Sequence, residues 1–106
     1  MRILFDQGTP APLRYHLSGH EVKLAFELGW STLQNGELLD AAENGGFEVF
    51  VTTDKNLRYQ QNLAHRKIAL IVLAAPSWPR VQNIAHDIAK VLETIKANDY
   101  IEIAVP

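Results

Sequence analysis

Two aspartates stand directly after strand-like segments of this chain, where a sheet would end and a loop begin. Asp6 follows the run Arg2–Phe5, and Asp54 follows the apolar, β-branched run that begins at Phe47. In open α/β sheets, ligands bind in the crevice outside the carboxyl ends of the strands, so two neighbouring strands would bring both carboxylates to one edge. Either aspartate alone could equally be a turn or helix-capping residue. The pair is the main functional signal in the sequence.

Two carboxylates at such an edge have a chemical consequence. They repel each other unless a proton or a cation is shared between them. Oxygen ligands of this kind suit Mg²⁺ or Mn²⁺, which bind through few carboxylates and keep several waters. A bound ion of this type activates water and neutralises the charge on a phosphate under attack. We therefore expect Asp6 and Asp54 to be ligands of Mg²⁺ or Mn²⁺.

Further polar residues could face the same crevice. Asn35 and Glu37 lie at the start of an expected helix, although a capped helix with an acid favourably placed for its dipole explains them equally well. Basic residues follow the second aspartate, where they could contact phosphate or simply form a solvated face. These basic residues are Lys55, Arg58, Arg66 and Lys67. The residues at the start of this helix and the basic cluster are therefore secondary candidates for the functional site.

Length and composition restrict the class of protein. The 106 residues form one expected domain, 1–106, and the hydrophobic fraction of 47% is that of an ordinary globular protein. The chain has no cysteine, which fits a reducing compartment, and no apolar run reaches the length of a membrane span. We expect a cytoplasmic protein that does not contact membranes. Its net charge of −2 means that any contact with nucleic acid needs a local basic patch or a bound cation.

Strand-like and helix-like segments alternate along the chain. Helices are predicted over 10–17, 36–44, 57–63 and 81–95, with Thr9 and Asn35 as N-caps of the first two and Pro79 as the start of the last. Strands are predicted over 2–5, 20–24, 47–53, 68–73 and 100–105. This alternation predicts a mostly parallel sheet of about five strands with right-handed crossovers and helices on both faces. The expected fold is a three-layer α/β/α sandwich.

Four segments of the chain carry a resemblance to a known family. They are Leu4-Phe5-Asp6 and the runs LQNGELL at 33–39, VTTDKNL at 51–57 and YQQNL at 59–63. In order and spacing they resemble the short PIN-like proteins of bacteria, a group long catalogued as a domain of unknown function. The resemblance covers nearly the whole chain, and the Thr-Thr-Asp-Lys-Asn segment is its most specific part.

The resemblance implies a PIN-type, metal-dependent ribonuclease, often the toxin of a toxin–antitoxin pair. Asp6 and Asp54 match two acids of the PIN site, and Thr52 matches the threonine of its Thr-x-Asp segment. Asn35 stands where the family leads us to expect an acid, as does Gln7. The implied cofactor is Mg²⁺ or Mn²⁺, and the implied partners are single-stranded RNA, a small antitoxin protein and a second copy of the chain.

In this reading the side chains have separate roles. The two aspartates hold the ion and Glu37 assists catalysis. Asn35, Thr52 and Asn56 orient water or substrate, while Lys55 and Arg58 contact phosphate.

Two other functions are compatible with the same residues. The first is a degenerate PIN-like binding module that keeps the fold and a partner surface but cleaves nothing, which the missing acids favour. The second is a receiver-like domain that accepts phosphate on Asp54. Receivers also need an acidic pair after the first strand and a lysine after the last, whereas here Gln7 follows Asp6 and the chain ends at Ala104-Val105-Pro106. The receiver is therefore the weakest of the three readings.

Overall fold

A parallel sheet of five strands organises the molecule, which the computed structural model describes over all residues 1–106. The strand order is β2-β1-β3-β4-β5, and every neighbouring pair is parallel. The predicted α/β class with a parallel sheet is thus confirmed, including a last strand at the sheet edge. The strands are β1 (Arg2–Phe5), β2 (Glu21–Leu24), β3 (Val49–Thr52), β4 (Ala69–Leu73) and β5 (Tyr100–Ile103).

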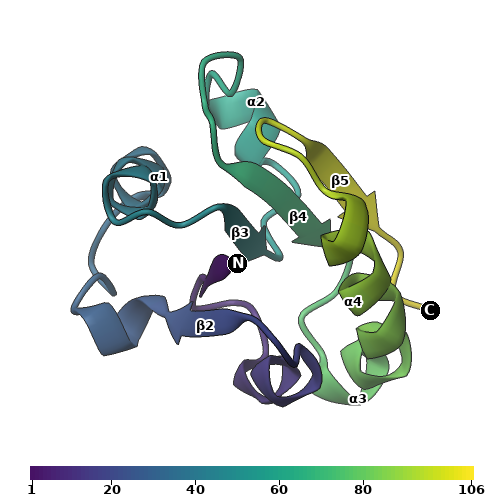
Figure 1. The fold of residues 1–106 in the computed structure, drawn as a ribbon. Coiled ribbons are helices and arrows are strands. Elements are labelled where there is room, and N and C mark those ends of the chain that lie inside the picture. The colour runs from purple at the N-terminus through teal and green to yellow at the C-terminus, as the bar shows by residue number, and fades with distance from the viewer.

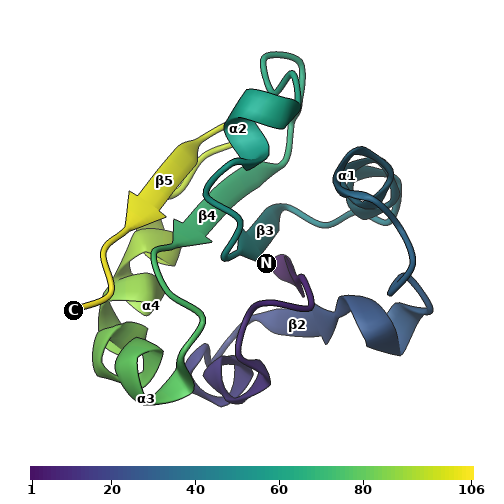
Figure 2. The ribbon, with the colours of Figure 1, turned by 180° about the vertical axis from the view of Figure 1, so that it is seen from behind.

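Helical segments cover both sides of this sheet (Figures 1 and 2). Helices α1 and α2 lie on one side, and α3 and α4 lie on the other. No helix combines the length and the apolar character needed to cross a membrane. The α-helices are α1 (Asn35–Asn44), α2 (Leu57–Gln60), α3 (Trp78–Val81) and α4 (Ala85–Thr94), and the 3-10 helices are η1 (Ala11–His16), η2 (Ala25–Leu28) and η3 (Gln82–Ile84).

The strands are buried on both faces because successive side chains point in opposite directions. In β3, Val49 and Val51 pack into a cluster with Ile88 of α4, whereas Phe50 packs with Leu39 of α1. All four residues of β3 are buried. The sequence predicted a strand here because of this continuous apolar run. Burial on both faces agrees with the position of β3 in the middle of the sheet.

The helix ends differ from the prediction in two places that matter for function. Thr9 does not cap η1, whose N-cap is Pro10, and Asn35 is the first residue of α1, with Gln34 as its N-cap. The side-chain hydrogen bonds of Thr9 and Asn35 go instead to the two aspartates. Both capping predictions were wrong for the same reason. A carboxylate competes with the helix end for the same polar group. For Thr9 this carboxylate is Asp6, three residues earlier, and for Asn35 it is Asp54, which the fold brings close.

Two other helices also differ from expectation. The segment predicted as helix over 57–63 ends at Gln60, because Gln61 already has extended backbone angles. The segment predicted from Val81 is interrupted, so that η3 separates α3 from α4. Pro79 does stand in the first turn of α3, as its fixed φ angle predicts.

Candidate functional site

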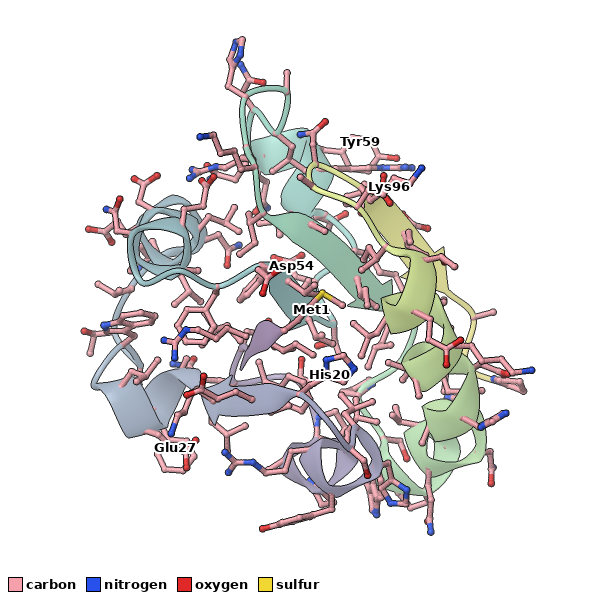
Figure 3. All side chains as sticks on the ribbon, in the orientation of Figure 1. Met1, His20, Glu27, Asp54, Tyr59 and Lys96 are labelled. Carbon is pink, nitrogen blue, oxygen red and sulfur yellow. The ribbon has the colours of Figure 1, made fainter.

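The pairing of β1 with β3 brings the two aspartates to the same edge of the sheet. Phe5 lies opposite Val51 in the register, so the next residues, Asp6 and Thr52, lie side by side. The backbone amide of Asp6 continues the ladder by donating to Val51 O at 3.2 Å. Asp54 follows two residues after Thr52, on the loop that leaves β3, and Figure 3 labels it near the middle of the molecule. Asp6 and Asp54 therefore follow neighbouring parallel strands at the same carboxyl edge of the sheet, and their sharing of one ion stays a prediction.

Two threonine hydroxyls hold the half-buried carboxylate of Asp6. Thr52 Oγ1 donates to Asp6 Oδ2 at 2.5 Å, and Thr9 Oγ1 donates to Asp6 Oδ1 at 2.7 Å. The backbone amide of Thr9 donates to the same Oδ1 at 3.0 Å. Thr52 is 1% exposed and Thr9 is 5% exposed, so water does not compete for these two hydroxyls. Asp6 is thus held by the Thr52 hydroxyl, by the Thr9 amide and by the Thr9 hydroxyl, whose single hydrogen is shared with Val51 O at 2.9 Å.

Asp54 is held by two donors from different parts of the chain. The backbone amide of Asn56 donates to its Oδ1 at 2.9 Å, and Asn35 Nδ2 donates to its Oδ2 at 2.9 Å. The backbone amide of Asp54 itself donates to Thr52 Oγ1 at 3.0 Å. The hydroxyl of Thr52 therefore links the two aspartates, since it donates to the side chain of one and accepts from the backbone of the other.

Room remains on both carboxylates for a further ligand. A carboxylate has about four lone-pair positions, of which three are used on Asp6 and two on Asp54. No lysine, arginine or histidine forms a salt bridge with either aspartate. Two uncompensated carboxylates with open lone pairs are a donor set that fits a hard divalent cation. No group of three or more acidic or histidine side chains gathers here, so amide oxygens and water would complete the shell.

Comparison with known proteins adds no relative to this picture. No protein-family model, curated protein or solved structure matches the chain. What the site can do chemically follows from its own residues. Those residues provide a fixed pair of oxygen donors at the carboxyl edge of a parallel sheet, which is the usual position for a ligand in this class of fold.

The remaining predicted site residues lie around this pair with other contacts. Glu37 is exposed, and its Oε1 accepts the backbone amide of Gln34 at 3.1 Å, which closes the start of α1. Lys55 is exposed and forms no salt bridge. The side chain of Asn56 makes no hydrogen bond, although its backbone amide binds Asp54. A catalytic role for Glu37 stays a prediction.

The predicted basic cluster is divided in the structure. Arg58 stacks over Tyr59 and Tyr100, and a hydrogen bond to the Tyr59 hydroxyl at 2.6 Å raises the pKa of the guanidinium. Arg66 binds Asp40 at 2.6 Å and Glu43 at 2.7 Å on α1, so its charge is already compensated. Of these cations, the unpaired Lys55 is the one next to Asp54 in the chain and free to meet a phosphate.

Sequence reasoning missed two residues at this edge. Thr9 was assigned to a helix end, although a threonine three residues after an aspartate also fits an aspartate-centred turn. Gly8, in the loop after β1, lies close to the loop after β3, so that a Cβ at position 8 would meet Thr53 Oγ1 at 2.5 Å. A side chain at this position would require the Thr53 hydroxyl to move. The only sequence signal for both was the polar turn after Asp6.

Replacement of Thr52 by valine tests the link between the two aspartates. Valine keeps the shape and suits a strand, but it leaves the Asp54 amide and one lone pair of Asp6 without their partner. We expect Thr52→Val to lower the free energy of unfolding by about 1–3 kcal/mol. Urea unfolding should show a lower midpoint at an unchanged slope.

Thr53→Val is the matched control, because Thr53 is the adjacent residue and its hydroxyl is not among the groups that bind either aspartate. Thr52→Ser, which keeps a hydroxyl, should recover most of the loss. Equal midpoints for Thr52→Val and Thr53→Val would contradict the linking role.

Proposed function

We propose that this chain is a Mg²⁺- or Mn²⁺-dependent endoribonuclease of PIN type that acts on single-stranded RNA. The observation that carries the proposal is the fixed, uncompensated pair Asp6 and Asp54 at the carboxyl edge of the sheet. The resemblance of the segments around these residues to PIN-like proteins supports the same chemistry. Without a cation this edge repels a phosphodiester, so binding and cleavage should both require added metal.

Each residue of the site has a defined part in this proposal. Asp6 and Asp54 hold the ion through their open oxygen positions. When bound, the ion supplies charge neutralisation at the phosphate and a more acidic water. Thr52 acts as a positioning residue, because its hydroxyl already serves the two aspartates. Lys55 contributes a positive charge for phosphate, and Glu37 accepts a proton from the attacking water once it leaves its helix-start contact.

The wider biological proposal follows the same resemblance. We propose a cytoplasmic toxin whose activity is held in check by a small antitoxin protein, with self-association as a homodimer as a further expectation. Co-expression with a candidate small antitoxin protein, followed by co-purification, tests the first of these partners. Size-exclusion chromatography with light scattering tests the second.

One observation favours a second function, a degenerate PIN-like binding module. Asn35 contributes an amide to the site where the resemblance leads us to expect an acid, and no third carboxylate joins the pair. A site with two acids retains less negative charge for a cation and less capacity to move protons. Cleavage, if present, should therefore be slow.

Metal-dependent cleavage of RNA separates the two functions. We expect a labelled single-stranded RNA pool to be cut slowly with Mn²⁺, more slowly with Mg²⁺ and not at all with excess chelator. Restoring Mn²⁺ after chelation should restore cleavage, because the carboxylates stay intact. Double-stranded RNA of the same composition serves as the comparison substrate.

Opposite results would favour the binding module. An RNA pool that stays intact with Mn²⁺, together with tight binding of a cognate small protein, would remove the nuclease proposal. Cleavage that persists in the presence of excess chelator would show that the nuclease activity does not require a metal ion.

A further inference from the structure

A hollow opens beside Asp6, and neither Thr52 nor Asp54 lines it. It has a volume of about 350 Å³, at the lower end of the roughly 300–1,000 Å³ typical of small-ligand pockets. The hollow is lined by the loop after β1, by the end of β2 with the start of η2, and by Pro76 in the loop after β4. The lining residues that matter here are Asp6, Gln7, Ala25, Phe26 and Pro76. A phosphate at the aspartate pair would therefore have this hollow next to it.

The rim of the hollow carries an aromatic ring in contact with water. Phe26 is 62% exposed, and it is one of three large hydrophobic side chains that are mostly exposed, with Tyr15 and Tyr59. Only Phe26 among these three lines the hollow that contains Asp6. A phenylalanine has no hydroxyl to hydrogen-bond with water, so an exposed ring beside a polar site offers an apolar face on which a flat ligand group can stack.

The backbone under this ring is firmly held. Glu27 Oε1 accepts the Leu24 amide at 2.8 Å and forms an ion pair with Arg14 at 2.9 Å. Arg14 in turn donates to Val22 O at 2.7 Å, which ties η2 to η1 and to β2. The Arg14 hydrogen bond also lowers the pKa of Glu27, so this pair stays charged near neutral pH. Figure 3 shows Glu27 on the turn that follows β2. Phe26 is thus presented on a fixed turn, which reduces the entropy lost on binding.

We propose that Phe26 and the hollow beside it form a base-binding subsite for single-stranded RNA. A nucleobase stacks on the Phe26 ring while the neighbouring phosphate lies at Asp6 and Asp54. This inference rests on the proposed ribonuclease function and adds the group that holds the substrate. Because every base has a π face, stacking of this kind tolerates any sequence and requires an unpaired base. Paired bases in a duplex cannot reach the ring.

Binding of a fluorescein-labelled single-stranded RNA tests the subsite, with Ca²⁺ in place of Mn²⁺ to suppress cleavage. We expect Phe26→Ala to weaken binding about tenfold, since one stacked base contributes roughly 1–3 kcal/mol. Phe26→Trp should bind at least as tightly as wild type. An RNA with abasic positions should lose affinity for wild type but not for Phe26→Ala. Tyr15→Ala is the matched control, because Tyr15 is an aromatic residue that is even more exposed than Phe26 and lies outside the hollow.

Each alternative outcome identifies what has failed. If Phe26→Ala binds and cleaves RNA as well as Tyr15→Ala does, the base subsite is wrong while the nuclease stands. If Phe26→Ala loses only the binding of a cognate protein, the ring belongs to a protein interface and the subsite is again wrong. If wild type neither binds nor cleaves RNA, the proposed function falls, and the subsite falls with it. Thermal melting of each variant should match wild type, because the ring is mostly exposed.

Discussion

Asp54→Asn should abolish most of the Mn²⁺-dependent cleavage while leaving the protein folded. The substitution removes a negative charge and one ligand of the proposed ion but keeps the size of the side chain. Loss of such electrostatic stabilisation costs about 100- to 1,000-fold in rate. The measurement is single-turnover cleavage of labelled single-stranded RNA across a Mn²⁺ titration. A cleavage rate close to that of wild type would remove Asp54 from the site.

The same variant should lose its thermal response to Mn²⁺. A ligand that binds only the folded state adds about 2.7 kcal/mol at one hundred times its Kd. For a domain of this size, that corresponds to a rise in Tm on the order of 10 °C in wild type. We expect Asp54→Asn to retain only a small part of this rise. This readout does not depend on catalysis, so it tests the ion site even if turnover is slow.

Asp87→Asn is the charge-matched control for Asp54→Asn. Asp87 is exposed in the first turn of α4, and its replacement changes the net charge equally. Asp6→Asn should also lose the Mn²⁺ response, but with a larger fall in stability. An amide nitrogen at position 6 would face donors from Thr9 and Thr52. Equal Mn²⁺ shifts in all three variants would mean that the ion binds elsewhere.

Asn35→Asp should make the protein less stable without metal and more active with it. Asn35 Nδ2 now donates to Asp54 Oδ2 at 2.9 Å, so an aspartate there replaces a hydrogen bond by a like-charge contact. We expect a loss of about 1–3 kcal/mol in metal-free buffer, measured by urea unfolding. A cation would bind the third carboxylate, so the Mn²⁺-dependent rise in Tm and the rate of RNA cleavage should both exceed those of wild type.

Asn83→Asp provides the control for this substitution, because Asn83 is exposed in η3 and makes no side-chain hydrogen bond. If Asn35→Asp and Asn83→Asp respond alike to Mn²⁺, position 35 lies outside the reach of the ion. A loss of stability in metal-free buffer without any gain in cleavage would instead support the binding-module function. In that case the amide of Asn35 serves only to hold Asp54.

The sequence by itself determined the strands and the place where each aspartate stands. Strand β3 was predictable because Val49, Phe50 and Val51 form a short, uninterrupted run of β-branched and aromatic residues, which is typical of a strand buried on both faces. The ends at Asp6 and Asp54 were predictable because a carboxylate cannot continue such a run into the core. Alternation of strands with helices then implied a parallel sheet, and parallel strands share one carboxyl edge.

Only the tertiary structure decided which polar groups serve these aspartates. The register of β1 against β3 places Thr52 Oγ1 on Asp6, a contact across 46 positions of sequence. Packing of α1 over Phe50 brings Asn35 to Asp54, across 19 positions. Thr9 binds Asp6, only three residues earlier, a local contact that the helix-cap prediction overlooked. Asn35 looked like a helix cap because local preference counts only the partners within a few residues. A charged partner from a distant segment binds a hydroxyl or amide more strongly than a helix end does, and that partner exists only once the chain has folded.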